Sequence, residues 1–184
     1  MSAKQPRSNN HNKQYHMEVA MSSQNKIKLL LVDDEIKFLE SIAKRLVLKD
    51  FDVIAASNGE EAIASAENDL FDVAVVDFQM PGMDGAQVLK ALKERHKYLE
   101  IIMLTGHATV DSAVECTKLG AFKYLEKPYA FEKLVEVIKE AYEARLKKKF
   151  EHNQKRIEEI QKLSISSSPL GLLRALARLD DKEK

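Results

Sequence analysis

Five short apolar runs, separated by segments with helical spacing, limit the possible folds of this chain more than any other feature. The runs are rich in Val, Ile and Leu without strict alternation, as expected for parallel strands buried on both faces. They cover residues 27–32, 53–56, 73–76, 101–104 and 121–125. Strand and helix therefore alternate over residues 27–163, which predicts an α/β fold: a doubly wound parallel sheet with helices on both faces.

The predicted helices have recognisable starts and apolar faces. After the first run, Leu39, Ile42 and Leu46 recur at steps of three and four, as on one side of a helix. Asn58 and Asp84 each precede a glycine and a helical segment. Because Asn and Asp side chains can accept hydrogen bonds from the first free backbone N–H groups, both residues are predicted to be N-caps.

The composition and residue pattern divide the chain into four parts. The 184 residues suffice for one α/β domain of roughly 120–150 residues with appendages. Residues 1–26 are polar and predict a disordered N-terminal tail, and residues 27–145 form the folded domain. Residues 146–163 continue its last helix, and 164–184 read as a flexible linker with a short amphipathic tail.

Charge and composition exclude several classes of protein. Residues 29–130 contain 11 basic and 18 acidic side chains, a net charge of −7, so nucleic-acid binding by this part is unlikely. Cys116 is the single cysteine, which excludes an internal disulfide. No apolar run reaches the length of a membrane span, and the polar start lacks the apolar stretch of a secretory signal. We expect a soluble, cytoplasmic protein.

Polar side chains follow four of the predicted strands at the point where each strand ends. Asp33 and Asp34 follow the first strand, and Asp77 ends the third. Thr105 ends the fourth strand, and Lys127 follows the fifth. Because parallel strands carry their carboxyl ends to one edge, these residues should meet there. The sequence thus predicts a site with three carboxylates, a hydroxyl and an ammonium.

Such a set suits phosphoryl chemistry. Three converging carboxylates repel one another unless a cation holds them, and their oxygens suit Mg²⁺, which often shares a phosphate oxygen. Lys127 and Thr105 supply a positive charge and a hydrogen-bond donor for the anion. An aspartate in such a pocket can act as the nucleophile and form an acyl phosphate.

Four segments of the sequence carry a family resemblance. LLLVDDE, VAVVDFQMPGMDG, IIMLTGHA and YLEKP, in this order, resemble the receiver domains of bacterial two-component response regulators over about residues 27–145. The resemblance implies a flavodoxin-like fold with strand order 2-1-3-4-5. It also implies a signalling domain that catalyses only its own phosphorylation and dephosphorylation, rather than a conventional enzyme.

The resemblance implies a role for each matching residue. Asp77 matches the aspartate that accepts a phosphoryl group from a sensor histidine kinase or phosphotransfer protein. Asp34, Asp77 and the backbone carbonyl of Gln79 would coordinate Mg²⁺ directly, with Asp33 acting through a metal-bound water. Lys127 would pair with the phosphoryl group.

Two further residues match the switch of the family. Thr105 would donate its hydroxyl to a phosphoryl oxygen, and its movement would make room for the ring of Tyr124 to turn inward. The added phosphoryl charge would thereby bias an element with two states.

Rival phosphoryl chemistries fit the sequence less well. Haloacid-dehalogenase-type phosphatases place a second aspartate two residues after the nucleophile as a general acid, and Gln79 at that position cannot donate a proton. The chain also contains no Gly-rich phosphate loop ending in Gly-Lys-Ser or Gly-Lys-Thr.

The region after the domain leaves two functions open. Apolar residues recur in a heptad-like pattern from Phe131 to Ile160, with Asn153 as a polar register residue in the same row, and favour a coiled coil or a partner helix beyond Leu146. No helix-turn-helix pattern follows. The chain is therefore expected to be a phosphorylation-dependent adaptor that contacts a downstream protein. Alternatively, it is mainly an oligomer or scaffold, such as a homodimer, that is assembled through the long helix.

Overall fold

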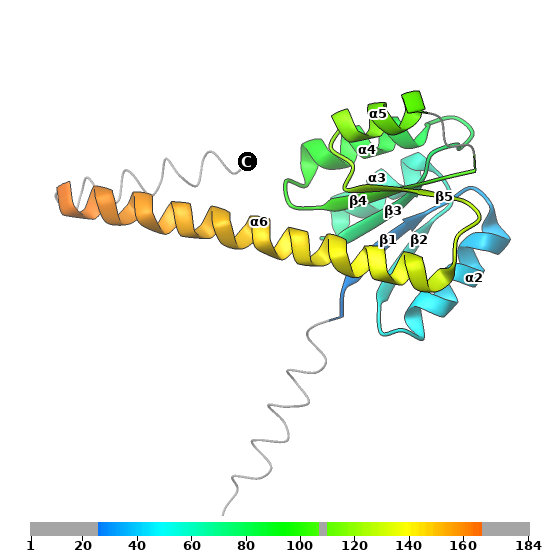
Figure 1. Cartoon of the computed structure of the whole chain (residues 1–184), viewed down its shortest axis with the longest axis horizontal. Helices are drawn as coiled ribbons and strands as arrows, with labels where there is room; N and C mark the ends of the chain where they lie inside the picture. The colour runs from blue at the N-terminus through cyan, green and yellow to red at the C-terminus, as the bar shows by residue number, and fades with distance from the viewer. Residues whose placement is uncertain (1–25, 107–109, 167–184) are drawn as a thin grey trace, which may run out of the picture.

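The computed structural model describes residues 26–106 and 110–166, which form a parallel sheet between two layers of helices (Figure 1). The strands are β1 (Lys28–Val32), β2 (Asp52–Ala56), β3 (Val73–Asp77), β4 (Glu100–Thr105) and β5 (Lys123–Glu126). The helices are α2 (Ile36–Val47), α3 (Gly59–Asn68), α4 (Gly85–Arg95), α5 (Val110–Lys118) and α6 (Phe131–Ser166). The strand order is β2-β1-β3-β4-β5, so the expected doubly wound sheet is confirmed.

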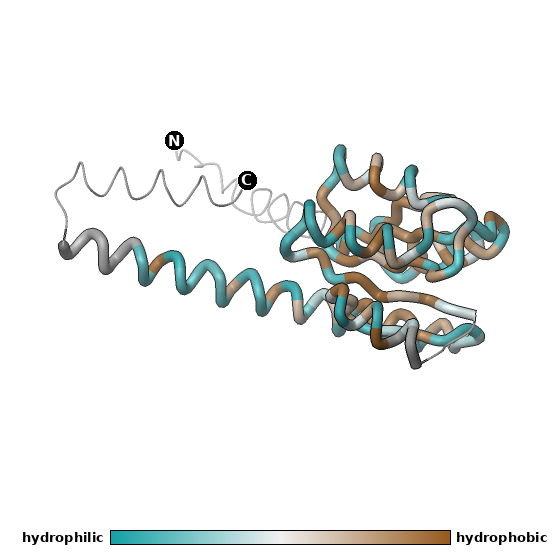
Figure 2. Tube along the Cα trace, turned by 90° about the horizontal axis from the view of Figure 1, so that it is seen from above, coloured by the Kyte–Doolittle hydropathy of each residue, from teal (hydrophilic) through white to brown (hydrophobic). Residues whose placement is uncertain are grey.

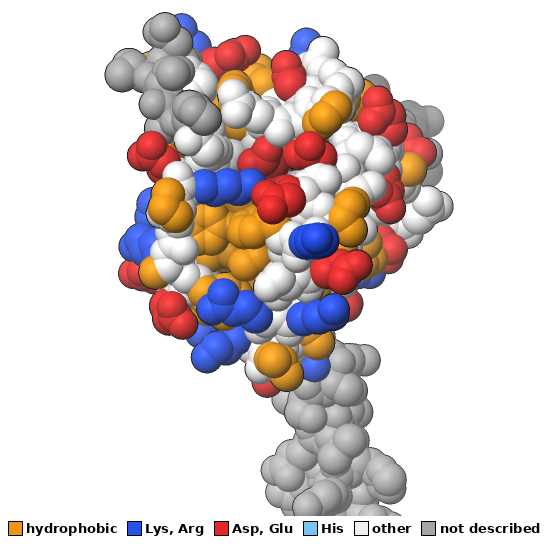
Figure 3. All heavy atoms as spheres, turned by 90° about the vertical axis from the view of Figure 1, so that its right-hand side faces the viewer, with side chains coloured by type: hydrophobic (Ala, Val, Ile, Leu, Met, Phe, Trp, Pro, Cys, Tyr) orange, Lys and Arg blue, Asp and Glu red, His pale blue; other side chains and the backbone are white. Residues whose placement is uncertain are grey.

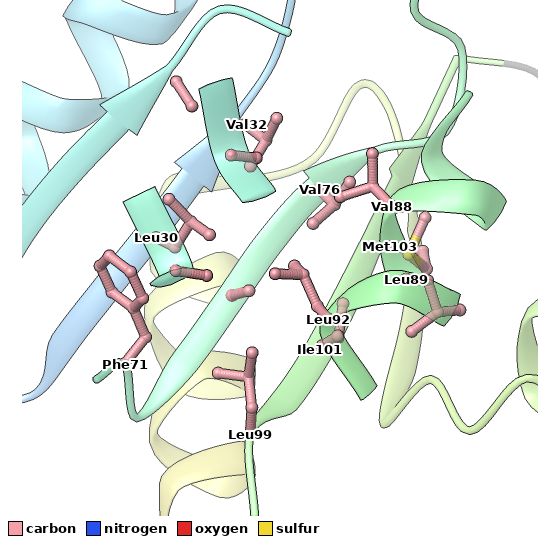
Figure 4. Close-up of a cluster of buried hydrophobic side chains, with 14 of the residues drawn as sticks. Leu30, Val32, Phe71, Val76, Val88, Leu89, Leu92, Leu99, Ile101 and Met103 are labelled. Carbon is pink, nitrogen blue, oxygen red and sulfur yellow. The ribbon is translucent and has the colours of Figure 1, made fainter. Parts of the chain in front are cut away.

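Alternate residues of the central strands pack into two separate cores. Leu30, Val76 and Met103 face α3 and α4, where the core also contains Leu89 and Leu92 (Figure 4). The neighbours of these strand residues face α2 and the first turns of α6; examples are Leu29, Val75 and Leu104. Because both faces of the sheet are covered, the interiors of its central strands are apolar on both sides, which explains the absence of strict alternation in the sequence.

Both predicted N-caps are confirmed. The Asn58 side chain accepts a hydrogen bond from the Glu61 N–H at the start of α3. Asp84 and Gln87 form a reciprocal capping box at the start of α4. At Gly85, an added Cβ would collide with the backbone carbonyl of Asp77, so glycine lets α4 begin directly beside the end of β3.

The fifth strand begins two residues later, and ends one residue later, than the apolar run 121–125 predicted. Ala121 and Phe122 precede β5 and are apolar because they pack against the two cores from the connecting turn. At its other end the strand extends to Glu126, which pairs with Thr105 of β4. The strand thus leads directly into Lys127.

The long helix differs from the prediction in two ways. Ser164–Ser166 were assigned to the linker, but α6 continues through them because nothing in their sequence breaks a helix. Beyond Leu146, where the apolar pattern favours a coiled coil or a partner helix, Lys148 instead pairs with Glu100 of β4, and His152 packs on Tyr98. The helix therefore stays attached to the domain beyond residue 145. Its last turns project away from the sheet (Figure 1).

Other predictions concern residues outside the described ones: the N-terminal tail up to residue 25 and the tail from residue 167. Within residues 26–106 and 110–166, no helix combines the length and the hydrophobicity needed to cross a membrane.

Candidate functional site

The predicted site residues come from four different strand ends, and two of them, Asp33 and Asp77, contact the Lys127 ammonium. Lys127 Nζ lies 2.6 Å from Asp33 Oδ2 and 2.7 Å from Asp77 Oδ1. Asp33 and Asp77 are 1% and 5% exposed, so both carboxylates are nearly withdrawn from water. One ammonium thus holds together two buried carboxylates that would otherwise repel each other.

Backbone hydrogen bonds fix these groups at the edge of the sheet. The Glu35 N–H donates to Asp33 Oδ1 at 2.9 Å, and the Gln79 N–H donates to Asp77 Oδ2 at 3.1 Å. The Lys127 N–H donates to the Thr105 carbonyl at 2.6 Å and extends the β4–β5 ladder by one residue. The lysine is therefore positioned by the sheet itself. Its peptide bond to Pro128 is cis.

Burial and charge act in opposite directions on the titration of this cluster. Burial raises the pKa of Asp77 above its ordinary value, although the hydrogen bond and charge of Lys127 work against this rise. For Lys127, burial lowers the pKa, but the hydrogen bonds and charges of Asp33 and Asp77 outweigh it and raise the pKa overall. The charged form of Lys127 is therefore favoured, whereas burial makes the Asp77 carboxyl harder to ionise than an ordinary aspartate.

The third predicted carboxylate has a different environment. Asp34 is exposed at the rim, next to the buried Asp33. Among the described residues, no three His, Cys, Asp or Glu side chains gather as a group that could hold a metal ion by themselves. Mg²⁺ in proteins keeps several waters and needs only one or two carboxylates. Asp33 and Asp77 already hold one cation, Lys127, between them, so their donor set fits a small divalent cation as well.

The two predicted switch residues lie on neighbouring strands. Thr105 is fully buried at the end of β4. Tyr124 is half-buried on β5, where its Oη lies 3.0 Å from Ser112 Oγ of α5. Its ring makes an edge contact with Phe78, the residue after Asp77, at a centroid distance of 6.4 Å. Tyr124 therefore connects the site to α5.

An apolar hollow beside Lys127 was not anticipated from the sequence. It has a volume of about 400 Å³ and lies between α2 and the connection from β5 to α6. Figure 3 shows it as a hydrophobic depression bordered by acidic and basic side chains. Lys127 Nζ lies 4.7 Å above the Phe38 ring, and Tyr129 Oη is buried with no hydrogen-bond partner among the described residues. Tyr129 could have been suspected, since it follows Lys127-Pro128, but nothing in the sequence singles out Phe38.

Cys116 is part of the core and not of the site. It is fully buried against the α3 and α4 side of the sheet, and burial raises the pKa of its thiol to about 11. A buried thiol with a raised pKa is protonated at neutral pH, which fits a packing role rather than thiol chemistry.

Solved structures with a similar fold include a receiver domain protein. A CheY-like receiver domain protein from Methanospirillum hungatei JF-1 has a TM-score of 0.65 at 30% identity and covers 67% of this chain and 99% of its own. A structure described as adenylate cyclase from Rhodopirellula baltica has a TM-score of 0.66 at 30% identity, over 71% of this chain and 98% of its own.

Curated relatives match over the same region. The response regulator protein FleR of Pseudomonas aeruginosa is 32% identical over 111 residues, which are 60% of this chain and 24% of FleR. The DNA-binding transcriptional regulator NtrC of Salmonella typhimurium is 34% identical over 60% of this chain and 24% of NtrC. The match thus spans about a quarter of each relative. The family model described as the response regulator receiver domain matches residues 29–139, and this chain belongs to that family.

Proposed function

We propose that this chain accepts a phosphoryl group on Asp77 from the phosphohistidine of a sensor histidine kinase or phosphotransfer protein. Receiver domains are signalling domains rather than conventional enzymes. The observation that carries the proposal is the buried Asp77 carboxylate at the end of β3, 2.7 Å from the Lys127 ammonium. The phosphorylated chain then signals through contact with a downstream protein.

The transfer needs an ionised aspartate and a site that tolerates negative charge. An Asp77 oxygen attacks phosphorus, the phosphorus–nitrogen bond breaks, and the leaving imidazole takes up a proton. Lys127 leaves its contact with Asp77 to pair with the incoming phosphoryl oxygens, and the Thr105 hydroxyl donates to another. Each of these groups extends from a strand end at the same edge of the sheet.

The same edge would hold Mg²⁺. Asp34, Asp77 and the Gln79 carbonyl are the proposed direct ligands, and Asp33 contributes through a bound water. When bound, the ion neutralises charge that develops on the phosphoryl oxygens. Asp33 and Asp77 support this assignment because both are buried and already share a cation.

The proposed output runs through Tyr124. Once Thr105 moves toward the phosphoryl group, the Tyr124 ring turns inward and its contact with Ser112 of α5 breaks. The half-buried position of Tyr124 and its 3.0 Å contact with Ser112 support this route, because they give the ring one defined resting state. The surface of α5 and β5 would then change for a partner protein.

Acetyl phosphate with Mg²⁺, followed by intact-mass analysis, tests the proposal. The wild type should gain the mass of one phosphoryl group, and Asp77→Asn should gain none. Asp52→Asn, at an exposed aspartate that begins β2, is the matched control and should label like the wild type. Equal labelling of Asp77→Asn and wild type would refute the assignment of the phosphoacceptor.

A second candidate function is assembly through α6, with the receiver as a modulator. It is favoured by three exposed apolar side chains on α6: Leu146, Phe150 and Ile157, which are 44%, 62% and 54% exposed. At 100° per residue they lie within about 40° of one another around the helix. A molecular mass that does not change with a phosphoryl mimic such as beryllofluoride, but falls on removal of residues after Arg145, would favour this function.

A further inference from the structure

A basic groove lies at the end of the sheet opposite to Asp77. It runs between α6 and the segment from the end of α4 to the start of β4, where these two elements lie side by side (Figure 1). Its volume is about 770 Å³, within the usual size range of small-molecule sites. Six basic residues line it: Lys93, Arg95, Lys97, Arg145, Lys149 and Arg156.

The walls of the groove are held in place by ion pairs beneath it. Glu100 is 1% exposed and pairs with Lys93 of α4 and Lys148 of α6. Arg145 Nη1 pairs with Asp72 Oδ1 at 3.1 Å. These contacts join both walls to the amino ends of the strands. The two walls of the groove are therefore fixed relative to the sheet.

Several donors remain for an anion after these pairs are formed. Arg145 Nε and His96 Nε2 are buried without a hydrogen-bond partner among the described residues. An arginine Nε–H can only donate, so this atom requires an acceptor that the described part of the protein does not supply. Lys149 is exposed on the adjacent turn of α6, and none of the described carboxylates lies within ion-pair distance of it.

We propose that this groove binds a small molecule that carries two or more linked phosphates, such as a nucleoside diphosphate or triphosphate. Arginine and lysine donors that converge on one hollow suit clustered phosphate oxygens. The half-buried Tyr98 and the buried Leu99 give the groove an apolar side against which the rest of such a molecule can pack. A nucleic acid fits less well, because residues 29–130 carry a net charge of −7 that would repel an extended polyanion.

The bound molecule would join α4 and α6. Arg95, which also pairs with Glu67 at 3.2 Å, comes from α4, whereas Arg145 and Lys149 come from α6, and one polyphosphate would contact both helices. Binding would therefore restrain α6 where it leaves the domain, at the end of the molecule away from the phosphoacceptor site.

Calorimetric titration of the full chain in Mg²⁺-free buffer tests the proposal, with ATP, pyrophosphate and adenosine as probes. ATP should bind saturably at one site, and adenosine should not bind. Equal affinity for pyrophosphate and ATP would show that phosphate alone is recognised, whereas tighter binding of ATP would show that the nucleoside contributes. Either result supports a polyphosphate site. Adenosine binding without pyrophosphate binding would overturn it.

Three variants localise the binding. Lys149→Glu should weaken ATP binding by about 10-fold or more, since it reverses a charge in the groove. Lys147→Glu makes the same change two residues earlier, outside the groove lining, and should change the affinity less than about twofold. Arg145→Lys, which keeps the charge beside Asp72 but removes the Nε donor, should also weaken binding. Equal effects of the two glutamate variants, no saturable binding of ATP, or preferential binding of a short DNA duplex would each refute the proposal.

Discussion

Lys127 is the residue on which the stability of the site depends most directly. Its ammonium pairs with Asp33 and Asp77, whose side chains are only 2% and 7% exposed. Removal of one partner from a buried ion pair leaves an uncompensated charge in a medium of low polarity. Lys127→Met should therefore lower the free energy of unfolding by about 3 kcal/mol at neutral pH in Mg²⁺-free buffer, as measured by urea denaturation.

The matched control for this variant is Lys37→Met, at an exposed position early in α2. It should leave the unfolding free energy nearly unchanged. If the two variants were equally stable, the ammonium would not be needed to hold the carboxylates together.

The raised pKa of Asp77 predicts how the stability of the folded chain depends on pH. Burial raises its pKa in the folded chain, so the folded state binds this proton more tightly than the unfolded state does. As the pH rises from about 4, the ordinary pKa of an aspartate, through the folded-state pKa, the wild type loses stability relative to the unfolded chain. Asp77→Asn has no proton to lose at this position.

We therefore compare the free energy of unfolding of Asp77→Asn with that of the wild type. The value for the variant minus the value for the wild type should increase as the pH rises from about 4 through the folded-state pKa of Asp77, and then level off. Urea denaturation at a series of pH values in Mg²⁺-free buffer measures it, with Asp52→Asn as the exposed control. A difference that is constant or decreases with rising pH would contradict the cause given for the pKa shift.

Single residues also show what the sequence could and could not predict about the site. Asp33, Asp77, Thr105 and Lys127 were predictable because each ends or follows an apolar run, and parallel strands bring such positions together. The pairing of Lys127 with both carboxylates was not predictable, since it depends on side-chain positions. Glu100 was overlooked for another reason: as a charged residue before an apolar run it resembles an exposed strand boundary, yet it is buried by Lys93 and Lys148.

At the scale of elements, α6 is attached to the domain by more than its apolar first turns. Lys148 of α6 pairs with the buried Glu100, and His152 contacts Tyr98 at a ring-centroid distance of 5.7 Å. The heptad-like pattern predicted the helix correctly but not this attachment, because periodicity identifies apolar contacts and these contacts are polar. The domain boundary at residue 145 itself stays a prediction.

Glu100→Gln tests this attachment, since it keeps the shape of the side chain but removes its charge. Without the charge, Lys148 loses its partner, and the segment from Arg145 to Arg156 should open more readily. Its amide hydrogens should exchange about 10-fold faster, equivalent to about 1.4 kcal/mol of local stability. Glu151→Gln, at an exposed position on the same helix, is the control. Unchanged exchange in Glu100→Gln would show that the ion pair does not hold α6.

At the scale of the whole molecule, α6 links two regions with different chemistry. Its first turns follow the cis Lys127–Pro128 bond and pack on the sheet, and its middle lies along the basic groove at the other end. Beyond the sheet the helix is mainly hydrophilic, with single hydrophobic positions (Figure 2). A mainly polar helix that extends past its domain gains stability when its few apolar side chains find a partner.

The exposed apolar side chains of α6 predict that two copies of the chain associate through this helix. Phe150 and Ile157 are seven residues apart and more than half exposed, and Leu146 lies one turn before Phe150 on the same side. Burial of a Phe side chain contributes about 2 kcal/mol, and a symmetric dimer would bury it in both copies. Phe150→Glu should therefore weaken self-association by about 100-fold or more, measured by sedimentation velocity over a range of concentrations.

Lys155→Glu is the control for this variant because it places a glutamate at an exposed position on the opposite side of the helix and should leave the association constant within a few-fold of the wild type. A wild-type chain that stays monomeric at about 100 μM, a concentration at which a Kd near 10 μM would give mostly dimer, would refute association through α6. In that case the exposed Phe150 and Ile157 would have to be covered by a different protein, and the adaptor function would be favoured over assembly.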